Sequence, residues 1–266
     1  MTDVLIAGAG PTGLVLALWL TKMGIKVRII DKTAEAGTTS RALAVQARTL
    51  ELYRQLDLSD AVLAEGHEVH AVNLWARGKK AAHVALDAIG EGMTPYPFLQ
   101  MFPQDKHEKL LIGRLQAFGV SVERQTELLS FTDTGSGIVA KLRRSDGQEE
   151  SCEAAYIAGC DGAHSIVRHA IGAEFAGGTY RQIFYVADVQ GSGQTFNGEL
   201  HLDLDEADFL AIFPMDAHGR ARLIGTVRDE RVEHPETLKF EDVRDKAIGN
   251  LALKIDKVNW FSAYRV

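Results

Sequence analysis

Three glycines and one acidic residue near the N-terminus have the types and spacing that bind a dinucleotide. Gly8, Gly10 and Gly13 follow an apolar run, and Asp31 stands eighteen residues beyond Gly13. Glycine lets the backbone approach a pyrophosphate, whose charge is favoured at a helix N-terminus. The carboxylate of Asp31 can accept hydrogen bonds from ribose hydroxyls and repels a 2′-phosphate, which disfavours NADP as the tightly held nucleotide. FAD and NAD both fit this pattern.

The elements around these residues form a strand, a turn, a helix and a second strand. Residues 3–8 are expected to be a buried strand, residues 14–23 a helix, and residues 25–30 a second apolar strand that ends at Asp31. Pro11 fits the first helical turn, where a missing N–H has no cost. This context favours a nucleotide site over a plain glycine turn.

Composition excludes several classes of protein. The chain has 266 residues, 46% of them hydrophobic, and a net charge of −7. That balance indicates a globular chain and gives no electrostatic reason to expect nucleic acid or an anionic membrane as a partner. The apolar run at residues 14–20 is too short to span a bilayer. Cys152 and Cys160 are expected to be buried free thiols and not part of a disulfide framework, so a cytoplasmic location is expected.

The rest of the chain alternates between helical and strand-like patterns. Apolar spacing predicts a helix over residues 40–58, with Arg41 in its first turn, and a further helix from Gln104 to Phe118. Residues 69–99 are strand-like, and turns within residues 120–160 predict a three-stranded antiparallel meander. After Gly178 the pattern predicts strands near 184–189, 199–204, 209–214 and 220–227, a helix over 240–253, and a strand over 258–266.

A second motif decides between FAD and NAD. Residues 159–168 are Gly-Cys-Asp-Gly-Ala-His-Ser-Ile-Val-Arg, a pattern of a strand end, a turn and a short helix. Together with the glycine turn and the Ser-Arg-Ala of residues 40–42, this motif resembles those of the FAD-dependent aromatic hydroxylases. These are single-component flavoprotein monooxygenases and include p-hydroxybenzoate, phenol and polyketide hydroxylases. The resemblance favours tightly bound FAD.

The resemblance also implies a fold class and a domain organisation. It implies an α/β chain of the glutathione-reductase-like, p-hydroxybenzoate hydroxylase type. A Rossmann-like FAD-binding domain with an antiparallel meander insertion is expected over residues 1–178, with residues 69–99 contributing to the substrate domain. A β-rich substrate domain is expected over residues 179–266. The family's later Gly-Asp-Ala-Ala-His motif does not occur, so we expect a form that ends before the C-terminal return to the FAD domain.

The family motifs assign cofactor roles to particular residues. The pyrophosphate is expected at Gly8, Gly10, Pro11, Thr12 and Gly13, and the adenosine end at Asp31 and Lys32. Arg41 and Gln104 are expected on the flavin side, and Asp161 and Gly162 complete the set. No catalytic residue is assigned, because the cofactor carries the chemistry. No metal site is expected, because no ligand cluster accompanies the closest histidine pair, His67 and His70.

The function implied by the resemblance is hydroxylation of an aromatic or polyketide-like small molecule with O2 and transiently bound NAD(P)H. NADH and NADPH stay open, as does a homodimer. One alternative is another flavin oxidoreductase of the same superfamily, although Trp19, Trp75 and Trp260 are too isolated for a halogenase motif. A second alternative is a non-catalytic nucleotide-binding fragment, which would bind ADP and FAD equally well.

Overall fold

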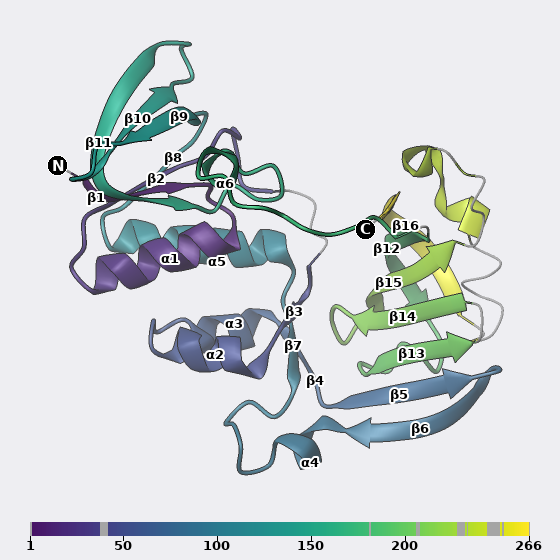
Figure 1. The fold of residues 1–266 in the computed structure, drawn as a ribbon. Helices are drawn as coiled ribbons and strands as arrows, with labels where there is room; N and C mark the ends of the chain where they lie inside the picture. Colours follow the sequence, from purple (N-terminus) through teal and green to yellow (C-terminus); the bar gives the residue numbers. More distant parts are fainter. Residues whose placement is uncertain are drawn as a thin grey trace. The chain divides into compact units, whose positions relative to one another are not determined.

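The computed structural model describes residues 2–37, 42–180, 182–205, 208–227, 232, 234–243, 251 and 253–265 (Figure 1). The chain divides into two compact units. Unit 1 comprises Met1–Ala42 and Gln104–Ala176, and unit 2 comprises Leu43–Pro103 and Gly177–Val266. Residues 69–99 lie within unit 2. The identification of these units as FAD-binding and substrate domains stays a prediction.

Unit 1 contains a six-stranded sheet in the order β8-β2-β1-β11-β10-β9. Strand β1 pairs in parallel with β2 and β11, whereas β9, β10 and β11 form an antiparallel meander. The predicted strand, turn, helix and second strand at the N-terminus and the predicted meander are therefore confirmed as elements of the fold. The elements are β1 (Thr2–Ala7), α1 (Pro11–Lys22), β2 (Val27–Ile30), α5 (Gln104–Ala117), β8 (Val122–Glu123), β9 (Glu127–Asp133), β10 (Ile138–Arg143), β11 (Glu149–Gly159) and α6 (Ile166–Ala170).

Helices α1 and α5 lie side by side along the sheet of unit 1 (Figure 1). Helix α1 begins with Pro11, three residues earlier than predicted, and fully buries Leu14 and Leu18. It ends before Gly24, whose φ of +80° is a left-handed conformation that glycine adopts without strain. The helix begins immediately after Gly10, close to the end of β1, and its first turn includes Gly13.

Unit 2 contains a seven-stranded sheet, β16-β12-β15-β14-β13-β5-β6, and a small sheet, β3-β7-β4. The predicted strands after residue 178 are all present, and β16 begins four residues earlier than expected. The elements are β3 (Ala44–Val45), α2 (Ala47–Arg54), α3 (Ser59–Glu65), β4 (His67–Val69), β5 (Ala71–Ala76), β6 (Lys79–Ala85), α4 (Leu86–Gly90), β7 (Leu99–Met101), β12 (Ile183–Ser192), β13 (Leu200–Asp205), β14 (Asp208–Pro214), β15 (Arg220–Val227), the 3-10 helix η1 (Pro235–Thr237) and β16 (Lys254–Arg265).

The prediction of one helix over residues 40–58 is wrong. Ala44–Val45 is a strand that pairs with β7, and the helix α2 begins only at Ala47. Pairing with a distant strand overrides the helical spacing of this segment. Residues 38–41, including Arg41, lie outside the described part of the chain. Of the helix predicted over 240–253, residues 240–243 are helical, and residues 244–250 lie outside the described residues.

A buried hydrogen-bond network joins β5 to β13 in unit 2. The indole N–H of Trp75 donates to Nδ1 of His201 over 2.9 Å, and His201 Nε2 lies 2.9 Å from Asn197 Oδ1. Since Nδ1 accepts, the proton of the neutral ring is on Nε2. Burial lowers the pKa of His201 to about 4. Burial also lowers the pKa of His107, on α5 of unit 1, to about 4.

These two histidines predict a loss of stability in mild acid. Their pKa values lie below the unfolded value near 6.5, so the unfolded chain binds more protons between about pH 6.5 and pH 4. The free energy of unfolding is expected to fall by about 2 kcal/mol for each histidine between pH 7.5 and pH 5. Urea denaturation at both pH values measures this fall. His201→Leu is expected to reduce the fall, whereas His218→Leu, at an exposed position, leaves it unchanged. Equal falls in the free energy of unfolding of the wild type and both variants would contradict the assignment of this pH dependence to His201.

Candidate nucleotide-binding site

The glycine turn packs directly against the second motif. Gly8 has a φ of +101°, and its N–H donates to the carbonyl of Ile30 over 2.8 Å. A Cβ on Gly8 would overlap the carbonyl of Cys160, and a Cβ on Gly13 would overlap the carbonyl of Gly8. Two of the three predicted glycines are thus required by the protein's own packing. Gly13 must be a glycine because its Cα lies against the carbonyl of Gly8, and not only because the helix packs on the sheet.

Gly10 differs from the other two glycines because the space beside it is open. A Cβ at this position would meet no protein atom within 4 Å. Gly10 is the N-cap of α1, yet no side chain caps this helix end, and Pro11 occupies the first turn. The first N–H groups of a helix have no partner within the helix and attract negative charge. The turn therefore fits a phosphate-bearing ligand at Gly10, Thr12 and Gly13.

Asp31, at the end of β2, is held as a carboxylate by several donors. Its Oδ2 accepts from the N–H of Ala9 over 2.7 Å, and its Oδ1 accepts from the N–H and the hydroxyl of Thr33. Burial by itself would raise the pKa of Asp31, but these hydrogen bonds and the nearby Arg124 outweigh burial and lower it. Asp31 therefore stays anionic and oriented at the end of the strand where ribose is expected.

Arg124 is a residue of this site that sequence reasoning missed. Its Nη1 donates to the hydroxyl of Thr33 over 3.2 Å and to the carbonyl of Glu35 over 3.3 Å, and it lies 3.8 Å from Asp31 Oδ1. Its Nη2 is buried and has no hydrogen-bond partner among the residues that the structure describes. A buried N–H without a partner is costly, so this atom is a candidate donor to a ligand. The only feature of the sequence that could have indicated Arg124 is its position directly after β8, the strand beside β2.

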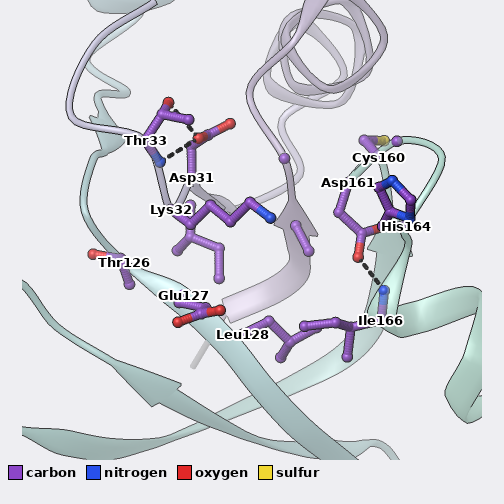
Figure 2. A pocket seen from close by; sticks show the side chains of 14 residues that line it. Asp31, Lys32, Thr33, Thr126, Glu127, Leu128, Cys160, Asp161, His164 and Ile166 are labelled. Atoms are coloured by element: carbon purple, nitrogen blue, oxygen red, sulfur yellow. Dashed lines mark hydrogen bonds between the residues drawn. The ribbon is translucent and has the colours of Figure 1, made fainter. Parts of the chain in front are cut away.

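A pocket of about 260 Å³ opens between Asp31 and the second motif. Figure 2 shows Asp31, Lys32 and Thr33 on one side, Cys160, Asp161 and His164 on the other, and Glu127 with Leu128 along a third side. Five residues predicted from the sequence line the pocket: Gly8, Asp31, Lys32, Asp161 and Gly162. The lining residues not predicted include Thr33, Thr126, Glu127, Leu128, Cys160, His164 and Ile166.

The second motif uses its own acid to build its turn and helix. Asp161 accepts a hydrogen bond from the hydroxyl of Ser165 over 2.5 Å and from the N–H of Ile166 over 2.7 Å. Gly162 has a φ of +80°, as such a turn requires. Burial, and then the charge of Asp161, raises the pKa of the Cys160 thiol, so the neutral thiol lines the pocket. Asp161 therefore shapes the pocket wall, with both carboxylate oxygens already hydrogen-bonded.

Gln104, predicted for the flavin side, does not line this pocket. It begins α5, its backbone N–H donates to the carbonyl of Ala42, and its Nε2 donates to Oε1 of Glu108 over 2.8 Å. Arg41, its predicted companion, lies outside the described residues. Of the predicted set, the structure brings Gly8, Asp31, Lys32, Asp161 and Gly162 together around one pocket, and their role in binding adenosine stays a prediction. The flavin side is described only at Gln104.

The two histidines considered for metal binding have separate partners in unit 2. His67 Nε2 lies 2.9 Å from the carbonyl oxygen of Gly198. His70 lies between Asp87 and Glu68, and hydrogen bonding to Asp87 raises the pKa of His70. In the parts of the chain that the structure describes, no three potential metal-ligating side chains come together.

Comparison with known proteins identifies the family. A sequence model described as "FAD binding domain" matches residues 1–262. The chain therefore belongs to this family of FAD-binding proteins. It is 35% identical over 270 residues to 6-methylpretetramide 4-monooxygenase of Streptomyces rimosus, covering 99% of this chain and 47% of that protein. It is 29% identical over 275 residues to a flavin-dependent monooxygenase of Mycobacteroides abscessus, covering 99% and 57%. The chain spans about half the length of these curated relatives.

Solved structures share the fold. p-Nitrophenol 4-monooxygenase PnpA from Pseudomonas putida DLL-E4 superposes with a TM-score of 0.86 at 21% identity, covering 100% of this chain and 68% of that one. A ternary complex of aklavinone-11 hydroxylase with FAD and aklavinone gives a TM-score of 0.80 at 25% identity, covering 100% and 54%. The predicted fold class is therefore confirmed as an α/β fold of the FAD-dependent hydroxylase type.

Within the described helices, none is both long and apolar enough to cross a membrane.

The different surroundings of the glycines predict separable effects on folding and binding. Gly10→Ala meets no protein atom and has an ordinary φ of −75°, so the free energy of unfolding is expected to stay unchanged or rise by up to about 1 kcal/mol. Its FAD affinity is expected to fall at least tenfold, because the methyl group fills the space for the pyrophosphate. Gly13→Ala overlaps the backbone of Gly8 and is expected to lose both stability and affinity.

Urea denaturation and FAD titration of the same preparations measure the two effects. Full FAD affinity in a stable Gly10→Ala protein would contradict a pyrophosphate at this turn.

Proposed function

We propose that this chain is the cofactor-holding portion of an FAD-dependent monooxygenase that hydroxylates an aromatic or polyketide-like small molecule with NAD(P)H and O2. The observation that carries the proposal is one arrangement in unit 1. Gly8 of the glycine turn, the oriented Asp31 carboxylate and the second motif line one pocket, and the open N-terminus of α1 follows Gly8 within three residues. The family match, which covers nearly the whole chain, supports FAD as the ligand.

The residues present fit the adenosine diphosphate half of FAD. Gly10, Thr12 and Gly13 would hold the pyrophosphate through N–H groups at the start of α1. Asp31 would accept hydrogen bonds from ribose hydroxyls, and the buried Nη2 of Arg124 supplies a donor beside it. Because Asp31 is anionic, a 2′-phosphate would be repelled. Bound FAD would supply the electron transfer and oxygen activation that no side chain of this pocket can provide.

The protein's own contribution is therefore binding, orientation and control of water. Asp31 and its donors fix the ribose end before a ligand arrives, because Thr33, Ala9 and Arg124 already hold the carboxylate. The pocket walls are partly apolar, with Leu128 and Ile166 facing the site (Figure 2). Such walls would exclude water from the adenine ring of a bound nucleotide. These roles require no side-chain nucleophile or acid–base pair.

The substrate class rests on the relatives. One relative is 6-methylpretetramide 4-monooxygenase. Another, 29% identical over 180 residues, is pentachlorophenol 4-monooxygenase of Sphingobium chlorophenolicum. Both names contain an aromatic or polycyclic substrate. We propose the same broad class for this protein, with the β-rich unit 2 as its substrate domain. Transient NAD(P)H, a homodimer and a cytoplasmic location stay predictions.

The proposal is tested by visible absorption and by turnover. The purified protein is expected to show flavin bands after incubation with FAD, and NAD(P)H oxidation is expected to rise when an aromatic substrate is added. Binding of FAD without stimulated oxidation by any aromatic or polycyclic compound would contradict the monooxygenase. Equal affinity for ADP and FAD would instead favour the nucleotide-binding alternative, since only the adenosine half of the ligand would then be recognised.

Removal of the Asp31 carboxylate tests the adenosine end of the site. Asp31→Ala is expected to weaken FAD and ADP by the same factor, at least tenfold, because both ligands share the ribose and diphosphate. The matched control is Glu153→Gln, which removes an exposed carboxylate on β11 and is expected to change neither affinity. Isothermal titration with both ligands measures the ratio. A loss for FAD alone would place Asp31 elsewhere in the site.

A further inference from the structure

We infer that Glu108 is a positioning residue that fixes which atom of Gln104 is presented to the cofactor. Glu108 lies on α5, one helical turn after Gln104, and only 5% of it is exposed. Its Oε1 accepts from Nε2 of Gln104 over 2.8 Å, and its Oε2 accepts from the N–H of Gly37 over 3.1 Å. The inference rests on the proposed function, since it assigns Gln104 to FAD.

The direction of the Gln104 amide follows from the chemistry of its neighbour. An ionised carboxylate can only accept hydrogen bonds, whereas a primary amide has a donor end and an acceptor end. The NH2 group of Gln104 must therefore face Glu108, which leaves the carbonyl oxygen Oε1 directed to other partners. A free amide could turn either end outward. Glu108 thus converts Gln104 into an acceptor, which suits a hydroxyl-bearing polyol such as the chain between the flavin ring and the phosphates.

Glu108 also anchors the chain that follows Asp31. Its second oxygen accepts from the N–H of Gly37, six residues after Asp31. Closer to Asp31, Thr33 holds the same stretch through hydrogen bonds with Asp31 and Arg124. Hydrogen bonds therefore hold residues 31–37 both at the ribose end and at Glu108. The structure uses a buried charge for this purpose, although burying a carboxylate is costly unless it is hydrogen-bonded.

The Glu108→Gln variant separates orientation from folding. The new amide can present either end to Gln104, so the fixed direction is lost while side-chain size is kept. FAD affinity is expected to fall about tenfold, and ADP affinity is expected to change less than threefold, because ADP has no polyol chain. The matched control is Asp105→Asn, which makes the same charge change on the same helix and is expected to alter neither affinity.

A double-mutant cycle shows whether Glu108 acts through Gln104. Gln104→Ala is expected to weaken FAD by a similar factor, and Glu108→Gln added to it is expected to produce no further loss. An independent second loss, or an equal fall in ADP affinity, would overturn the inference. If Glu108→Gln fails to fold, Glu108→Asp, with its shorter reach, is expected to give the same split between the two ligands.

Spectra of bound FAD provide a readout that a purely structural role would not change. Glu108→Gln is expected to shift the visible flavin bands, whereas Asp105→Asn leaves them as in the wild type. An unshifted spectrum together with full FAD affinity would overturn the inference and leave the proposed function intact. A folded wild-type protein that binds ADP but no FAD would instead contradict the proposed function itself.

Discussion

The site depends on the close contact between two chain segments that are far apart in sequence. Strand β11 pairs in parallel with β1, so Gly159 lies opposite Ala7, and the N–H of Cys160 donates to the carbonyl of Ala7 over 2.7 Å. The turn at Gly8 then packs against Cys160 so closely that no side chain fits between them. This approach places the second motif beside the helix N-terminus, at the carboxyl ends of the strands, where α/β sheets bind ligands.

Around that contact, the structure organises a small number of charges into fixed positions. Asp31 and Glu108 are both carboxylates with most of their hydrogen-bonding capacity used by the protein. Each therefore has a defined direction before any ligand binds, and the loop of residues 31–37 lies between them. A site organised in this way needs little rearrangement on binding, which favours affinity because less conformational entropy is lost. Arg124 contributes the complementary positive charge.

The sequence predicted much of this arrangement and missed specific parts for physical reasons. Glycine spacing and the position of Asp31 are local signals, so the strand, turn, helix and strand of unit 1 were predictable. The pairing of β3 with β7 is a long-range contact that no local sequence pattern indicates. It makes Ala44–Val45 a strand, although the local spacing predicted a helix there. Glu127 reaches the pocket through the position of β9, and Arg124 comes within 3.8 Å of Asp31 from the end of β8; both placements follow from tertiary structure alone.

The parallel pairing of β1 with β11 also has a consequence for biosynthesis. Ala7 leaves the ribosome roughly 150 residues before its partner Gly159, and at about 5–20 residues per second the delay is on the order of ten to thirty seconds. During that interval β1, whose Leu5 and Ile6 are fully buried in the finished fold, lacks one of its two neighbouring strands. The nascent N-terminal segment is therefore a strand with an open edge, a natural substrate for a holding chaperone.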